Sequence, residues 1–212
     1  MPLESITKIN DASSWVLWKI EEEIGNFFIV LDLKKEDMGS YDSISNHYKK
    51  LEWLASRVAA KYLLEQAGVD YQGISKDEYG KPHLVNLKGF ISVSHSYPYV
   101  AVIYHQQQDV GIDLEKPRER ILKISKKFLN ENEQAYTMED TRKITLLWSA
   151  KETLYKLHGR KFVIFKENLE VEAFDLNSEG ILTGIIKLNG KESFYKIKYE
   201  NHNDYLVCYT VR

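Results

Sequence analysis

The 212-residue chain contains one cysteine, four prolines and no long apolar run. The single thiol, Cys208, cannot form an internal disulfide or a thiolate metal cluster, so a divalent ion would need oxygen or histidine ligands. Apolar runs such as Phe27–Leu31 fall far short of the roughly 20 residues that a membrane-spanning helix needs. The 29 basic and 31 acidic side chains almost balance, which argues against a broad nucleic-acid-binding face. We therefore expect neither a membrane span nor a nucleic-acid partner.

The opening segment, MPLESITKIND, also lacks features of a targeting signal. It has neither the basic start and apolar core of a secretory signal nor the Arg-rich bias of a transit peptide. The sequence therefore favours a cytoplasmic location. A hydrophobic content of 43% is that of a globular chain rather than a disordered one.

The first half of the chain shows one long helical pattern between strand patterns. From about Ser43, apolar residues keep helical spacing until Gly68, where a left-handed cap is expected. A shorter helix is predicted from Ile24. The predicted strands of this half are Ser13–Ile20, Phe90–Ser94 and Tyr99–Tyr104.

The second half repeats this order of elements. A strand at Val110–Glu115 precedes a mostly helical stretch over 121–136 and a long helix over Asp140–His158, which Gly159 ends. The remainder alternates like a meander of antiparallel strands with an Asn189-Gly190 hairpin. We therefore predict an α+β fold with an N-terminal lobe over residues 1–106 and a C-terminal lobe over residues 107–212.

Two acidic residues stand out in the segment VGIDLE. Asp113 and Glu115 are two residues apart on a predicted strand, so their carboxylates share one face while Ile112 and Leu114 are predicted to point into the core. An exposed strand tolerates such a pair with water and counterions. The alternative is that a hard cation such as Mg²⁺ holds the two carboxylates together.

The segment WSAKETLYK places a second set of polar residues on the long helix. Trp148, Glu152 and Lys156 lie in one stripe at i, i+4 and i+8, with Lys151 beside them. A surface Glu–Lys pair of this kind would contribute only about 0.3–0.5 kcal/mol. However, basic residues gather around the glutamate, which suits an anion bound through a metal. They are Lys151, Lys156, His158, Arg160 and Lys161.

A third set lies in the segment SVSHS, where Ser94 and His95 close a strand. Such a histidine is more often a hydrogen-bonded structural residue than a catalyst, but it can also donate to a phosphate. The sequence has no nucleophile elbow and no glycine-rich phosphate loop. A phosphate would therefore be held by side chains, with Lys81 of the GKP turn as another candidate.

These segments, taken in order, resemble the 4′-phosphopantetheinyl transferases of the surfactin-synthetase-activating type. The resemblance covers about residues 50–175 and rests on five motifs. They are GKP (80–82), SHS (94–96), VGIDLE (110–115), Phe128 with Glu133, and WSAKETLYK (148–156). It implies two similar α+β lobes related by a pseudo-twofold axis, with coenzyme A in an active cleft between them. It also implies Mg²⁺-dependent transfer of 4′-phosphopantetheine from coenzyme A to a serine of an apo acyl- or peptidyl-carrier protein. The other product is adenosine 3′,5′-bisphosphate.

The resemblance also assigns roles to individual residues. Asp113, Glu115 and Glu152 would bind Mg²⁺. Lys151, Lys156, His95 and the adjacent Ser94 would contact the phosphates, while Lys81 and Arg57 would lie near the nucleotide. Glu152, Lys156 and Glu133 would form the catalytic set. Upstream of Arg57 the chain departs from the family, because SISNHYKK offers only Lys49 and Lys50 as basic residues.

Several alternatives remain at this level. The general base would be either Glu152 or a water on the metal. A non-catalytic carrier-protein or nucleotide-binding module is the main competing function, and a magnesium-dependent hydrolase of nucleotide diphosphates is a third. The joint presence of Asp113, Glu115, Glu152 and Lys156 favours the enzyme. We expect a monomer, because an internal pair of lobes makes self-association unnecessary for building a cleft.

Overall fold

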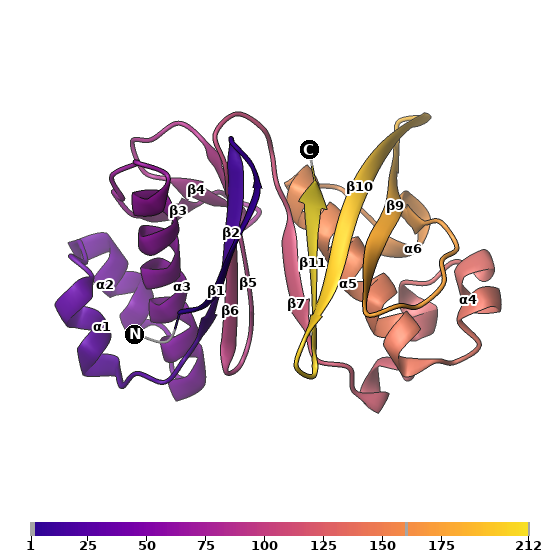
Figure 1. Cartoon of the computed structure of the whole chain (residues 1–212), viewed down its shortest axis with the longest axis horizontal. Helices are drawn as coiled ribbons and strands as arrows, with labels where there is room; N and C mark the ends of the chain where they lie inside the picture. The colour runs from indigo at the N-terminus through magenta and orange to yellow at the C-terminus, as the bar shows by residue number, and fades with distance from the viewer. Residues whose placement is uncertain (1–2, 160, 212) are drawn as a thin grey trace. The chain divides into compact units, whose positions relative to one another are not determined.

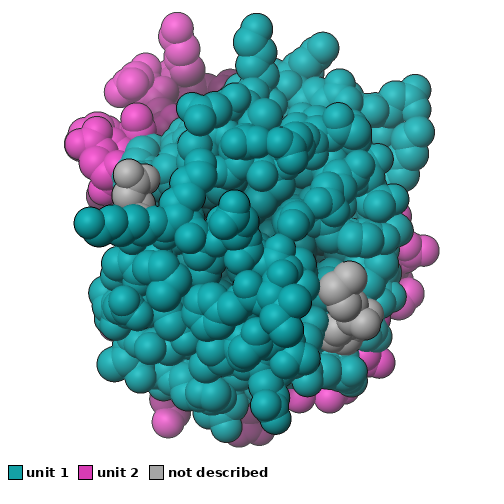
Figure 2. Space-filling model, turned by 90° about the vertical axis from the view of Figure 1, so that its left-hand side faces the viewer, with its two compact units in different colours: residues 1–77, 82–108 teal, residues 78–81, 109–212 magenta. Residues whose placement is uncertain are grey.

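The computed structural model describes residues 3–159 and 161–211, which adopt mixed α+β structure and form two compact units (Figure 1). Unit 1 comprises residues 1–77 and 82–108, and unit 2 comprises residues 78–81 and 109–212 (Figure 2). The predicted α+β class is confirmed. Among the described residues, no helix combines the length and the apolar character needed to cross a bilayer.

Unit 1 is a four-stranded antiparallel sheet of order β1-β2-β6-β5 with one long helix, α3, packed against it (Figure 1). A short hairpin, β3–β4, follows α3 in the chain. The strands are β1 (Leu3–Asn10), β2 (Ser13–Lys19), β3 (Ile74–Lys76), β4 (Pro82–Leu84), β5 (Phe90–Ser96) and β6 (Tyr99–His105). The helices are α1 (Ile24–Val30), α2 (Lys35–Asp42) and α3 (His47–Gln66).

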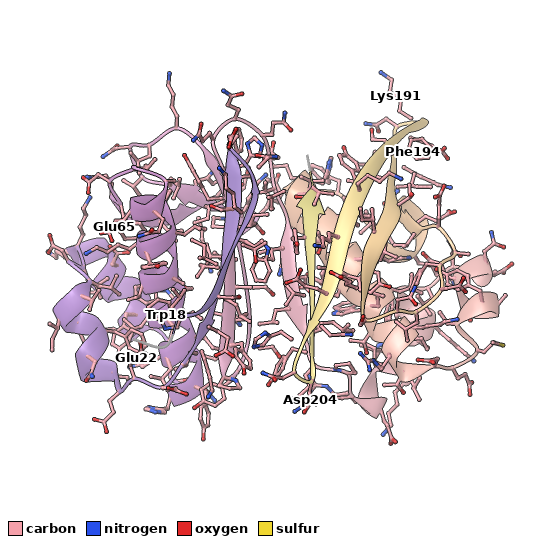
Figure 3. All side chains as sticks on the ribbon, viewed as in Figure 1. Trp18, Glu22, Glu65, Lys191, Phe194 and Asp204 are labelled. Carbon is pink, nitrogen blue, oxygen red and sulfur yellow. The ribbon has the colours of Figure 1, made fainter. Side chains whose placement is uncertain are left out.

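The core of unit 1 lies between this sheet and α3. Trp18 of β2 is fully buried there (Figure 3), and its ring centroid lies 6.3 Å from that of Tyr62 on α3 in an edge-to-face contact. Gly68 follows α3 with a φ of 71°, as its predicted left-handed cap requires. Helix α2 was not predicted, because its polar sequence KEDMGSYD has no apolar stripe.

Unit 2 is a five-stranded antiparallel sheet of order β7-β11-β10-β9-β8, against which α5 packs. The Asn189-Gly190 turn joins β9 to β10 with both φ values positive, 52° and 70°, as the sequence predicts. The strands are β7 (Ile112–Glu115), β8 (Leu169–Val171), β9 (Glu179–Leu188), β10 (Lys191–His202) and β11 (Tyr205–Val211). The helices are α4 (Glu131–Thr137), α5 (Thr141–His158) and α6 (Phe165–Asn168), preceded by the 3-10 turns η1 (Glu119–Ile121) and η2 (Ser125–Lys127).

Local sequence explains where α5 begins and ends. The Asp140 side chain accepts hydrogen bonds from the backbone N–H groups of Arg142 and Lys143, at 2.8 and 2.9 Å, and so caps the first turn. Gly159 ends the helix with a φ of 90°. The predicted helical stretch over 121–136 is instead divided between the end of η1, the turn η2 and α4.

Candidate active site

The strand β7 approaches α5 closely because residue 111 is glycine. A Cβ atom at this position would overlap the backbone oxygen of Thr153 and come within 3.2 Å of the Leu157 nitrogen, both in α5. The strand is also tied to its neighbour β11, since the Thr210 N–H donates to the Gly111 carbonyl at 3.0 Å. The glycine of VGIDLE therefore sets the separation between the acidic strand and the helix.

Asp113 lies on the face of β7 that α5 covers. It pairs with Cys208, a member of the unit 2 core, and is only 3% exposed. Its Oδ1 atom accepts a hydrogen bond from the Lys156 ammonium at 2.7 Å. Its Oδ2 atom is buried and makes no hydrogen bond with the described residues. The carboxylates therefore share the core side of the strand, and the exposed-strand interpretation of this pair is wrong.

Glu115 is the second carboxylate on this face, and its surroundings favour its neutral form. Its Oε1 atom accepts a hydrogen bond from the indole N–H of Trp148 at 3.1 Å. Burial and, to a smaller extent, the negative charge of Asp113 together raise the pKa of Glu115 to about 7, against the opposing effects of Trp148, Lys156 and Arg120. A cation placed beside both carboxylates would relieve this repulsion.

Glu152 lies on α5 between the two residues that contact β7. It is four residues after Trp148 and four before Lys156, so the contacts of these residues to Glu115 and Asp113 bracket it along one helix face. Its side chain is half-buried. The stripe predicted from the sequence therefore faces the acidic strand.

The oxygen donors of this site suit Mg²⁺, which prefers carboxylate ligands and retains several waters. Within residues 3–159 and 161–211, however, no group of three or more acidic, histidine or cysteine side chains is close enough to hold a metal ion. Lys156 and Trp148 already donate to one oxygen of Asp113 and one of Glu115, respectively. The structure thus brings the two strand carboxylates together with α5, but it does not join all three acids in a preformed cluster.

Lys151 was predicted to contact phosphates, but it lies in the core of unit 2. Its side chain is 0% exposed and its ammonium donates to Glu133 at 2.6 Å and to the carbonyl oxygens of Phe128 and Phe165 at 2.7 and 3.3 Å. Burial lowers the pKa of Lys151, while the Glu133 carboxylate acts in the opposite direction. These contacts use all three donor hydrogens of the Lys151 ammonium inside the protein. Lys151 therefore has a structural role and does not contact a phosphate.

Glu133 was predicted to be catalytic, and it is the buried partner of this lysine. It is 1% exposed and accepts backbone hydrogen bonds from Asn130 at 2.9 Å and Val171 at 3.1 Å. Together with Asn130 it forms a capping box at the start of α4. Glu133 therefore connects α4, α5 and β8 and does not face a substrate. The pattern N-x-x-E was the sequence signal for this role.

Lys81 sits at the far end of α5 from Trp148. Its ammonium forms an ion pair with Asp109 and donates to the Leu157 carbonyl at 3.3 Å. Its side chain is 12% exposed. Of the basic residues predicted nearby, Lys161 lies over the ring of Tyr79 at 4.8 Å, and Arg160 is outside the described residues. The GKP lysine is thus held beside the C-terminal turn of α5.

The remaining predicted residues belong to unit 1. Ser94 is buried on β5, whereas the neighbouring His95 is exposed and has its Nδ1 atom 3.2 Å from a carboxylate oxygen of Glu52 on α3. Sequence reasoning did not single out Glu52. Glu52, Ala55 and Ala59 are at i, i+3 and i+7 of α3, and both alanines are buried. This helical spacing could have indicated that the Glu52 carboxylate is buried.

Arg57, also in unit 1, lies beside a cavity of about 540 Å³. Its guanidinium stacks on Trp53, with Cζ 3.2 Å from the ring centroid, and its Nε atom is 3.7 Å from Asp37. Burial lowers the pKa of Arg57 to about 10, against the opposing effects of Tyr71 and Asp37. The cavity also contains Lys34 and Lys76, so its lining carries positive charge.

A second cavity, of about 400 Å³, opens beside Glu115 in unit 2. It combines basic side chains with an apolar floor, and sequence reasoning did not identify it. The run EKPRERILK was the available signal, because it places four basic residues directly after the acidic strand. The lining residues are Glu115, Lys116, Arg118, Arg120, Ile121, Lys123, Ile124, Thr145 and Trp148.

Comparison with known proteins gives matches to a single class of enzyme. The sequence model of the 4′-phosphopantetheinyl transferase superfamily matches residues 109–210. The chain is 28% identical over 183 residues to the 4′-phosphopantetheinyl transferase gsp of Aneurinibacillus migulanus, covering 82% of this chain and 73% of that protein. It is 31% identical over 111 residues to the 4′-phosphopantetheinyl transferase Sfp of Bacillus subtilis, covering 50% of this chain and 48% of that protein. These matches confirm the enzyme class that the sequence predicted, 4′-phosphopantetheinyl transferase.

Proposed function

We propose that this chain transfers the 4′-phosphopantetheine group of coenzyme A to a serine hydroxyl of an apo acyl- or peptidyl-carrier protein. It would act with Mg²⁺, release adenosine 3′,5′-bisphosphate and belong to the surfactin-synthetase-activating type. The observation that carries the proposal is the pair of carboxylates on β7, Asp113 and Glu115, held against the Trp148–Glu152–Lys156 stripe of α5. Buried like charges on one strand face are costly unless a cation or a proton neutralises them.

We assign the metal to Asp113, Glu115 and Glu152. The raised pKa of Glu115 indicates that this site favours added positive charge, and Glu152 is the acidic residue that α5 presents between Trp148 and Lys156. When bound, Mg²⁺ would neutralise charge on the pyrophosphate of coenzyme A. Lys156 would supply fixed positive charge to the same group, because its ammonium lies beside Asp113.

The proposed reaction is an in-line displacement at the β-phosphorus of coenzyme A. The serine oxygen forms a new P–O bond while the bond from this phosphorus to the oxygen that bridges the two phosphates breaks, and adenosine 3′,5′-bisphosphate leaves. The serine proton must pass to a base. We assign this role to Glu152, because its side chain is half-buried whereas Asp113 is 3% exposed.

The coenzyme A contacts are assigned to fewer residues than the sequence predicted. His95 and Ser94 on β5, Lys81 and Arg57 remain proposed contacts. Lys151 and Glu133 are left out, because each uses its polar atoms within the core of unit 2.

The cavity beside Glu115 is the surface that we propose for the carrier protein. Its basic side chains suit an acidic helix, and Ile124, 38% exposed, offers an apolar contact. The surface adjoins the proposed metal ligand Glu115, so a bound carrier would present its serine close to the reacting phosphate. We expect the enzyme to act as a monomer.

A transfer assay tests this proposal. The purified chain is incubated with coenzyme A, Mg²⁺ and an apo carrier protein, and the carrier is weighed by mass spectrometry. We expect the mass of one phosphopantetheine group to be added on serine. Coenzyme A cleaved beside an unchanged carrier would identify a hydrolase, and carrier binding without modification would identify a non-catalytic module.

Two matched variants test the site assignment. Asp113→Asn keeps the size of the side chain and should lower the transfer rate by roughly 100-fold or more. Asp175→Asn is the control, because Asp175 is exposed in the segment between β8 and β9 and belongs neither to the proposed metal site nor to the proposed carrier surface. Equal rates for the two variants would remove Asp113 from the site.

A further inference from the structure

A buried glutamate of α3 receives three donors at the end of β5. Glu52 is 3% exposed and lies on a face of α3 that also carries the buried residues Ala55 and Ala59. The Tyr97 backbone N–H donates to its Oε1 atom at 3.2 Å. Its Oε2 atom accepts from the Lys49 ammonium at 2.6 Å and lies 3.2 Å from Nδ1 of His95. These contacts offset the cost of burying a carboxylate.

Glu52 is buried, whereas its partners His95 and Lys49 are exposed to solvent. The side chain of Glu52 is 4% exposed, whereas those of His95 and Lys49 are 41% and 58% exposed. The negative charge is therefore fixed inside unit 1, and the two groups that can carry positive charge lie toward solvent. Such an arrangement orients an imidazole for an anion that arrives from outside.

The contact between Glu52 and His95 determines which ring nitrogen of His95 carries a hydrogen. An ionised carboxylate only accepts hydrogen bonds, so Nδ1 must carry its hydrogen to bond to Glu52. A carboxylate neighbour also favours the doubly protonated ring, in which the opposite nitrogen, Nε2, is a charged donor. Charge-assisted hydrogen bonds to phosphate are about twice as strong as neutral ones.

We propose that Glu52 is a positioning residue for phosphate recognition: its carboxylate holds Nδ1 of His95 and so presents Nε2–H to a phosphate of coenzyme A. This inference rests on the proposed function, which makes His95 a phosphate contact. The competing explanation is that Glu52 merely anchors the turn after β5 through the Tyr97 N–H.

The variant Glu52→Gln separates the two explanations. Glutamine has nearly the same size and keeps an amide oxygen for the Tyr97 N–H, so the turn contact is retained. Its amide group can donate to Nδ1, which then has to be the acceptor. Nδ1 of His95 should therefore change from protonated in the wild type to unprotonated in the variant. The ring ¹⁵N chemical shifts of histidine-labelled protein measure this change directly.

A double-mutant cycle provides the kinetic test. We expect Glu52→Gln and His95→Ala each to lower kcat/KM for coenzyme A by about 10-fold or more, and the double variant to be no slower than His95→Ala alone. Glu65→Gln is the matched control on the same helix, because Glu65 is 51% exposed near the end of α3 (Figure 3). It should leave kcat/KM unchanged. Independent, multiplying losses in the double variant would overturn the positioning role.

A binding measurement distinguishes failure of this inference from failure of the proposed function. Inorganic pyrophosphate is titrated into the unmodified chain and into Glu52→Gln while the His95 ring resonances are followed. If the chain transfers nothing but pyrophosphate shifts His95 more weakly in the variant, the inference holds and the proposed function fails. If the chain transfers phosphopantetheine but Nδ1 is unprotonated in the wild type, the inference fails and the function stands.

Discussion

Each unit packs a long helix against an antiparallel sheet, but the two units place their charged groups on opposite elements. In unit 1 the long helix α3 supplies a carboxylate, Glu52, and the strand β5 supplies an imidazole, His95. In unit 2 the helix α5 supplies an ammonium, Lys156, and the strand β7 supplies a carboxylate, Asp113. One carboxylate receives three donors in unit 1, whereas in unit 2 Lys156 donates to Asp113 and Trp148 donates to Glu115. Unit 1 therefore has donors for an anion, and unit 2 has acidic oxygens for a cation.

The largest expected difference between the units concerns their lysine–glutamate pairs. Lys151→Met leaves Glu133 buried without its cation, so we expect the free energy of unfolding to fall by about 3–5 kcal/mol. Lys49→Met removes an ammonium that is 58% exposed and should cost at most about 1 kcal/mol. Urea unfolding of each variant measures both values.

A second variant keeps this prediction testable if Lys151→Met fails to fold. Lys151→Met combined with Glu133→Leu removes the unpaired charge and should recover most of the lost stability. Equal unfolding free energies for Lys151→Met and Lys49→Met would contradict the structural role of Lys151.

Two glycine substitutions test whether the strand β7 must pack as closely against α5 as the structure shows, with a glycine of unit 1 for comparison. Gly111→Ala forces a Cβ atom against the backbone of Thr153, so we expect a loss of about 2–3 kcal/mol. Gly39→Ala in α2 meets nothing within 4 Å and should stabilise unit 1 by up to about 1 kcal/mol. Thermal unfolding compares the variants. A neutral Gly111→Ala would show that β7 and α5 do not need their close contact.

The pH dependence of stability tests the buried carboxylate Glu115 of unit 2. Burial raises the pKa of Glu115 to about 7, so between pH 4.5 and 7 the native chain holds a proton that the unfolded chain has released. The stability that Glu115 contributes is therefore complete below pH 4.5 and is lost as the pH rises through 7. Relative to Glu115→Gln, the unmodified chain in a chelating buffer should lose on the order of 1–2 kcal/mol between pH 5 and 8. Parallel unfolding curves for the two proteins across this range would contradict the raised pKa.

Much of the fold follows from local sequence rules. Helical spacing and the stop residues Gly68 and Gly159 located α3 and α5, and Asn189-Gly190 located a hairpin. Helix α2 has no apolar stripe to reveal it. The stretch before α4 has apolar residues at helical spacing, but the chain breaks there into 3-10 turns.

The candidate site was predictable in its acidic strand but not in its buried ion pairs. The spacing of Trp148, Glu152 and Lys156 predicted one stripe, and the structure bonds its two ends to β7. Lys151 was misassigned because the family resemblance made it a phosphate contact, although it continues the core spacing of Ile144 and Leu147. Its burial depends on Glu133, which lies 18 residues away in sequence, and local patterns do not encode such pairings.

The measurement that tests the central claim most directly is the location of a bound cation. Mn²⁺, which like Mg²⁺ prefers oxygen ligands, broadens the NMR signals of nearby amides. We predict that broadening centres on Asp113, Glu115 and Glu152, and that Glu152→Gln weakens Mn²⁺ binding at least about 10-fold. Broadening centred elsewhere, or unchanged binding in Glu152→Gln, would contradict the proposed convergence of β7 and α5 on one metal ion.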